Sequence, residues 1–121
     1  MHRSLWADTA ADEGKIWREF LGILETVEKP LLIHYGSYET AFLKRMGERY
    51  GKPPDGSAAT ETIKAAVNLL SVIFAHVYFP TFSNGLKEIA GHLGFQWSDP
   101  AVTGIETIKW RHEWSASRAL D

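Results

Sequence analysis

The chain has 121 residues, of which 45% are hydrophobic and 12% aromatic, and this suffices for one globular domain with its own core. Thirteen Lys and Arg against fifteen Asp and Glu give a formal net charge of -2, so no overall charge excess attracts nucleic acid or anionic lipid, and any such contact must be local. The absence of cysteine excludes disulfides and thiolate metal sites.

The N-terminus, MHRSLWADTAADEG, has neither a basic start nor a long apolar stretch, so it contains no visible secretory signal and we expect a cytoplasmic protein. Residues 63–82 form the most apolar stretch and are about long enough to span a bilayer. Polar residues interrupt this stretch and Pro80 breaks it. We therefore expect a buried helix there and no contact with a membrane.

The first predicted element is an amphipathic helix over residues 12–27, where apolar side chains recur at the spacing of one helix face. Thr9 and Asp12 are both suitable N-caps for it. The preceding segment HRSLWA, residues 2–7, is a candidate edge strand.

A short apolar run follows the first helix and predicts a central parallel strand over Leu31–Tyr35, covered on both faces. Gly36 ends the strand, and Ser37 is placed to cap a helix over residues 38–50 that ends at Gly51. Helix, strand and helix in this order indicate part of a doubly wound α/β sheet.

The second half of the chain is predominantly helical. An exposed loop over residues 51–60 precedes predicted helices at 61–77, 86–93 and 105–119. We assign residues 1–121 to a single domain. Because one strand cannot make a sheet, we expect the rest of the sheet to lie outside this chain, or the chain to form a homo-oligomer through its exposed strand edge.

Glu39 is the main candidate for a functional residue. It follows the predicted strand by four residues and lies early in the next helix, and doubly wound sheets bind ligands outside the carboxyl ends of their strands. An acid in a first helical turn is also common for a local reason, since the helix dipole favours negative charge there. Spacing alone favours this local explanation.

The motif around Glu39, LLIHYGSYETAFLKRM, resembles the second motif of the exonuclease branch of the ribonuclease H-like superfamily. In that motif a strand ends in Tyr or His plus Asn or Gly, and an aromatic residue then precedes an acid. The matching residues here are His34, Tyr35, Gly36, Tyr38, Glu39, Phe42 and Leu43. The later segments YFPTFSNGLKEIA, LGFQW and IKWRHEW resemble a predicted ribonuclease H-like domain that accompanies RecB-like nucleases, so the resemblance extends from Leu5 onwards.

This resemblance implies an exonuclease-like, metal-dependent phosphodiester hydrolysis with nucleic acid as substrate. It implies a site for two Mg²⁺ or Mn²⁺ ions, with Glu39 as a catalytic residue and metal ligand. Such ions lie about 4 Å apart and each needs several oxygen ligands.

The chain departs from the family pattern in its acids. The family uses four carboxylates, including an Asp-x-Glu pair on a strand, whereas Asp12 and Glu13 are adjacent and sit at a helix start. Glu39 stands where most of these exonucleases have Asp. Asp121, the last residue of the sequence, lies about where the last acidic motif of the family would begin. We therefore expect a partial domain that is inactive by itself, or alternatively a non-catalytic interaction or scaffold module.

Several other residues are candidates for nucleic-acid contact. They are aromatic, cationic or able to offer backbone donors at a helix start: Tyr35, Tyr38, Ser83, Asn84, Lys87, Lys109 and Arg111. For the SNG segment a capped helix is the favoured alternative, because it lacks the repeated glycines of a phosphate loop. Trp110 and Trp114, next to the last two cations, are expected to pack into the core.

Two histidines have structural alternatives that we favour. His34 lies in the apolar strand, and we expect a buried, hydrogen-bonded core residue rather than a ligand or base. His112 and Glu113 lack a second histidine at helical spacing, so this pair does not indicate zinc.

Overall fold

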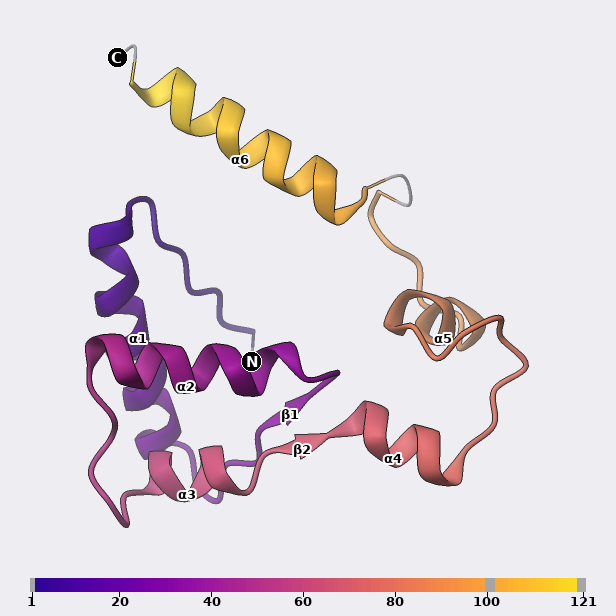
Figure 1. Ribbon diagram of the computed structural model, residues 1–121, viewed down its shortest axis with the longest axis horizontal. Coiled ribbons are helices and arrows are strands. Elements are labelled where there is room, and N and C mark those ends of the chain that lie inside the picture. Colours follow the sequence, from indigo (N-terminus) through magenta and orange to yellow (C-terminus); the bar gives the residue numbers. More distant parts are fainter. Residues whose placement is uncertain (1, 100–101, 120–121) are drawn as a thin grey trace. The chain divides into compact units, whose positions relative to one another are not determined.

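The computed structural model describes residues 2–99 and 102–119, and the chain divides into two compact units, Met1–Pro80 and Thr81–Asp121. Figure 1 labels the elements of both units. The first unit contains α1 (Ala10–Thr26), β1 (Ile33–His34), α2 (Tyr38–Tyr50), α3 (Ala58–Lys64), β2 (Val67–Asn68) and α4 (Leu69–His76). The second unit contains α5 (Leu86–His92) and α6 (Gly104–Arg118).

The described part of the chain is mostly helical with one two-stranded parallel sheet, which confirms the predicted α/β fold class with its predominance of helices. Strand β1 lies within the predicted Leu31–Tyr35 run and pairs with β2, so that Ile33 is opposite Val67 and His34 is opposite Asn68. Figure 1 shows the two short strands side by side.

The partner strand β2 corrects the prediction of one continuous helix over 61–77. Helix α3 ends at Lys64, and the N–H of Val67 then donates to the carbonyl of Leu32 at 2.9 Å. An apolar run without periodicity fits a buried helix and a strand equally well, so the sequence did not reveal this break. The candidate edge strand over 2–7 was also wrong, since the structure has no strand there.

The expectation of a buried helix within residues 63–82 was wrong as well. Helix α4 has only eight residues, and Phe74 on it is 79% exposed. Of the eight residues of α4, Ile73 is the one that is buried. Among the described residues, no helix combines the length and the apolar character needed to cross a membrane.

Helix α1 begins with a local hydrogen-bond network that uses both predicted cap residues. Thr9 is the N-cap, and the carboxylate of Asp12 accepts hydrogen bonds from the N–H of Thr9 at 3.0 Å and from its hydroxyl at 2.8 Å. The bond from the N–H of the N-cap to the acid at the third helical residue is one half of a capping box, and it favours a helix start at this position.

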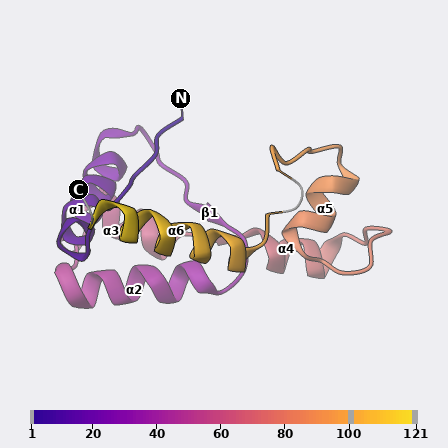
Figure 2. The same cartoon turned by 90° about the horizontal axis from the view of Figure 1, so that it is seen from above.

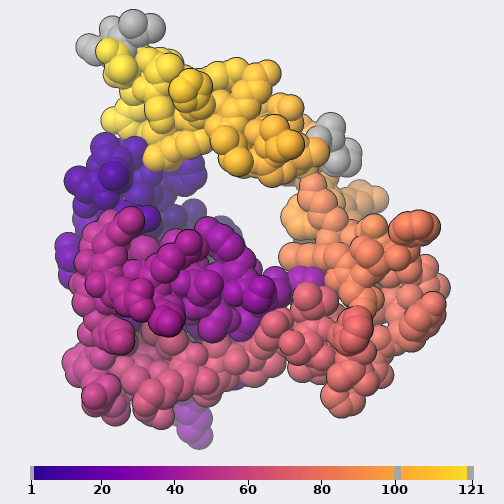
Figure 3. Space-filling model, viewed as in Figure 1, coloured from indigo at the N-terminus to yellow at the C-terminus, as the bar shows by residue number. Residues whose placement is uncertain are grey.

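The core of the first unit lies where α1 packs against α2 and α3, as Figure 2 shows from above. Trp17 of α1 is 3% exposed, and its indole N–H donates to the carbonyl of Gly51 at 2.9 Å. The carboxylate of Glu25 accepts from the N–H of Ala59 at 2.8 Å, so an acid of α1 meets the positive end of α3. In the space-filling view the three helices form one continuous mass (Figure 3).

The second unit has a smaller core around Ile89 of α5, which is 4% exposed. The rings of Phe95 and Trp97 make an edge-to-face contact at 4.8 Å. In α6, Trp110 is 47% exposed and Trp114 is half-buried, so the expectation that both tryptophans pack into a core was wrong for Trp110.

Candidate functional site

The turn between β1 and α2 positions Glu39. Gly36 has φ of +109°, a conformation that favours glycine, and it reverses the chain directly after the strand. Glu39 is the second residue of α2 and therefore lies beyond the carboxyl end of β1, where the sequence placed it. The first helical turn also gives this carboxylate a favourable interaction with the helix dipole.

The carboxylate of Glu39 faces back toward His34. Its Oε2 lies 3.8 Å from Nδ1 of His34, which is within ion-pair distance but too long for a hydrogen bond. This oxygen is buried and has no hydrogen-bond partner, although the side chain as a whole is 45% exposed. A buried acceptor without a donor is costly, and such atoms occur at sites that bind an ion or water.

His34 is the buried, hydrogen-bonded histidine that we expected. Its side chain is 8% exposed, and Nδ1 lies 2.9 Å from the carbonyl oxygen of Gly36. With a proton on Nδ1 the ring donates to this carbonyl and supports the turn that precedes Glu39.

Sequence reasoning missed Asn68, which holds the same turn from the neighbouring strand. Its Oδ1 accepts from the N–H of Gly36 at 3.0 Å and from the N–H of Leu70 at 3.1 Å. One side chain therefore caps α4 and ties the end of β1 to the end of β2. Asparagine before a helix is a known cap signal, but its contact with Gly36 depends on strand pairing.

The described residues do not fit a two-metal site. They contain no group of three or more His, Asp or Glu side chains placed to hold one ion, and Glu39 is accompanied only by His34. Glu13, which the sequence places beside Asp12 at the start of α1, is not near Glu39, because it pairs with Tyr50 and Arg49. The donors on the described part of the chain are thus too few for a pair of divalent ions.

Glu13 binds the other end of α2. Its carboxylate accepts from the hydroxyl of Tyr50, and Nη1 of Arg49 lies 2.9 Å from the same oxygen. The hydrogen bond from Tyr50, followed by that from Arg49, lowers the pKa of Glu13. The same hydrogen bond to Glu13 raises the pKa of Tyr50. The cluster joins α1 to α2 and leaves Glu13 away from Glu39.

Two of the nucleic-acid candidates lie beside Glu39 in the first unit. Tyr38 precedes it on α2 and is 68% exposed, and Tyr35 is half-buried after β1. The other five candidates, Ser83, Asn84, Lys87, Lys109 and Arg111, belong to the second unit.

The SNG segment uses its backbone donors within the protein. The N–H of Ser83 donates to the Glu88 carboxylate at 2.7 Å, and the N–H of Gly85 donates to the Ser83 hydroxyl at 3.1 Å. Lys87 donates to the carbonyl of Val102. The donors of Ser83 and Gly85 are therefore used within the protein, while the N-cap of α5 is Gly85 and receives no side-chain cap hydrogen bond. Asn84 is half-buried and also interacts with another group of the protein.

The cations of α6 contact their own helix. Nζ of Lys109 lies 4.0 Å from the carboxylate of Glu113. The guanidinium carbons of Arg111 and Arg118 lie 4.5 and 4.9 Å from the centre of the Trp114 ring. Contacts of these two kinds at a helix surface contribute little to stability.

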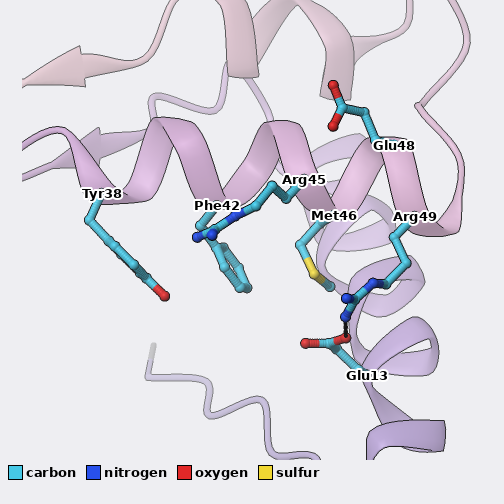
Figure 4. A pocket seen from close by; sticks show the side chains of 7 residues that line it. All are labelled: Glu13, Tyr38, Phe42, Arg45, Met46, Glu48 and Arg49. Carbon is cyan, nitrogen blue, oxygen red and sulfur yellow. Dashed lines mark hydrogen bonds and ion pairs between the residues drawn. The ribbon is translucent and has the colours of Figure 1, made fainter.

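A groove of about 620 Å³ runs along α2, between this helix and α1. It is lined by Glu13, Tyr38, Phe42, Arg45, Met46, Glu48 and Arg49, which Figure 4 shows as sticks. Sequence reasoning singled out only Tyr38 as a contact residue in this set. The sequence does contain a signal for Arg45: it follows Tyr38 by seven residues, and this spacing places the two side chains on the same helix face.

Comparison with known proteins assigns the chain to a family. The family model of the RNase H superfamily matches residues 2–120. No curated protein and no solved structure matches the chain significantly.

The chain therefore belongs to the RNase H superfamily. It is a nuclease-related domain of a family whose members generally use divalent metals and act on nucleic acids.

Proposed function

We propose that this chain is part of a metal-dependent, exonuclease-like enzyme in which Glu39 supplies one oxygen ligand to Mg²⁺ or Mn²⁺. The observation that supports this most is the buried Oε2 of Glu39, which lacks a hydrogen-bond partner and lies at the carboxyl end of a parallel strand. Membership of the RNase H superfamily supports a phosphodiester substrate.

The companion ligands come from outside the described residues, because Glu39 and His34 are too few donors. An added strand at the open edge of β1, from another segment of the protein or a second copy, would bring acids to this place. Ile33 and Leu31 are 57% and 63% exposed, as expected of a sheet that lacks neighbours. On this proposal residues 1–121 are one partial domain of a cytoplasmic protein, and a homo-oligomer is one way to complete it.

A substitution pair tests the proposal in the natural full-length protein. Glu39→Gln removes the charged ligand, and Glu61→Gln is the matched control, because Glu61 also lies in the first turn of a helix and pairs with exposed Lys64. Hydrolysis of a labelled oligonucleotide with Mn²⁺ should fall at least about a hundredfold in the Glu39 variant and stay unchanged in the control. Equal activity of both variants would contradict the proposal.

The second candidate is a non-catalytic interaction or scaffold module. The observation that favours it is the same shortage of acids, since no group of three ligands exists among residues 2–99 and 102–119. If it is correct, the full-length protein binds nucleic acid but does not hydrolyse it with Mg²⁺ or Mn²⁺, and Glu39→Gln changes neither property.

A further inference from the structure

The groove along α2 carries an exposed stack of side chains next to Glu39. Tyr38, Phe42 and Arg45 lie on one side of the helix, four and seven residues apart. The rings of Tyr38 and Phe42 are 6.2 Å apart with 18° between their planes, and the guanidinium carbon of Arg45 lies 5.7 Å from the centre of the Tyr38 ring. Figure 4 shows Arg45 reaching past Phe42 toward Tyr38. We call these three residues the α2 shelf.

The side chains of the α2 shelf are largely exposed to solvent, unlike side chains that pack into the core. Tyr38 is 68% exposed and Arg45 is exposed, while Phe42 is half-buried beneath them. An exposed aromatic ring contributes little to the core, and the solvent-facing part of the Tyr38 ring is open to a ligand. The exposure thus argues against a purely structural role.

The positive charge of Arg45 is not neutralised by the acids of the groove. Glu13 pairs with Arg49 at 2.9 Å, and Glu48 pairs with Lys44 at 4.0 Å. In the described part of the chain no carboxylate pairs with Arg45, whose contact is with the Tyr38 ring. A guanidinium in this position is available for a phosphate.

We propose that the α2 shelf binds single-stranded nucleic acid, with bases stacked on Tyr38 and Phe42 and a phosphate paired with Arg45. Exposed aromatic rings beside an arginine are the chemistry that binds single strands, because every base has a face that stacks. A duplex keeps its bases stacked on each other, so the shelf discriminates against it. This inference rests on the proposed function, because it places the substrate strand beside Glu39.

The dimensions of the shelf suit a short strand. Seven residues of helix span about 10 Å, and stacked nucleotides rise about 3.4 Å each, so the distance from Tyr38 to Arg45 accommodates two or three nucleotides. Glu39 directly follows Tyr38 in the first turn of α2, so a strand on the shelf starts within one helical turn of Glu39.

Binding of a fluorescein-labelled oligonucleotide to the 121-residue chain, followed by anisotropy in EDTA, tests the shelf without metal or hydrolysis. We expect the single strand to bind more tightly than the same sequence as a duplex. Tyr38→Ala should weaken binding roughly tenfold, and Tyr38→Phe should retain it, because stacking needs the ring and not the hydroxyl. Arg45→Gln should weaken binding and reduce the slope of log K against log salt by about 0.7.

The controls are an exposed tyrosine and an exposed arginine of the same unit, Tyr78→Ala and Arg18→Gln. Circular dichroism checks that each variant is folded. The proposal is overturned if the wild-type chain binds no oligonucleotide, if it binds duplex equally well, or if the shelf variants bind like the controls. Oligonucleotide binding that depends on the shelf, together with hydrolysis that is insensitive to Glu39→Gln, would refute the proposed metal ligand and retain the shelf.

Discussion

The backbone N–H of Gly36 donates a hydrogen bond to Oδ1 of Asn68, with 3.0 Å between nitrogen and oxygen. These residues are 32 positions apart, and their contact joins the turn that carries Glu39 to the neighbouring parallel strand. The same oxygen accepts from the N–H of Leu70 and caps α4. The position of Glu39 therefore depends on a side chain of the second strand.

Asn68→Ala should destabilise the chain by about 1–3 kcal/mol, because it removes a helix cap and leaves the N–H of Gly36 without its acceptor. Asn68→Asp keeps an oxygen in place and should cost less. Urea unfolding followed by circular dichroism measures both changes. Equal stability of Asn68→Ala and the wild type would show that this contact does not hold the turn.

A pair of glycines in α1 should respond in opposite directions to the same substitution. A Cβ on Gly14 would lie 2.8 Å from Cδ1 of Tyr50, so Gly14→Ala should force the ring aside and destabilise the chain by about 1–3 kcal/mol. A Cβ on Gly22 would meet nothing within 4 Å, so Gly22→Ala should stabilise the helix by up to about 1 kcal/mol. Urea midpoints of the two variants compare them directly, and stabilisation by both would mean that Tyr50 does not pack against Gly14.

The Glu13 cluster predicts a dependence of stability on acid. The folded state lowers the pKa of Glu13 below its ordinary value of 4.5, chiefly through the Tyr50 hydroxyl and then through Arg49. The stabilisation is therefore fully present above pH 4.5 and is lost as the pH falls through the lowered pKa of the folded state.

The measurement is the difference in urea midpoint between the wild type and Glu13→Gln at several pH values. This difference should be constant near neutral pH and should shrink below about pH 4.5. A difference that does not change with pH would mean that Glu13 ionises alike in the folded and unfolded chain.

Helices α1, α2 and α5 could be predicted from the sequence because their signals are local. Thr9 and Asp12 mark the start of α1, and Gly51 follows the end of α2 with φ of +102°. In the same way Gly94, with φ of +90°, follows α5. Each signal acts within one helical turn, so the order of residues carries it.

The pairing of the strands could not be predicted in this way. Val67 and Asn68 form a strand of two residues inside an apolar run, which is too short to show a period of two. Their role depends on β1, more than thirty residues earlier. The position of Glu39 after a strand was therefore predictable, whereas the hydrogen bond that holds its turn was not.

The central claim is that Glu39 ligates a divalent ion whose remaining ligands lie outside the described residues, and Mn²⁺ titration of the 121-residue chain followed by NMR tests it most directly. Paramagnetic Mn²⁺ should broaden the resonances of Glu39 and His34 before those of Glu61, without a saturating stoichiometric endpoint. Broadening at Glu39 no greater than at Glu61 would contradict its role as a ligand. A sharp endpoint at one or two ions per chain would contradict the claim that further ligands are needed.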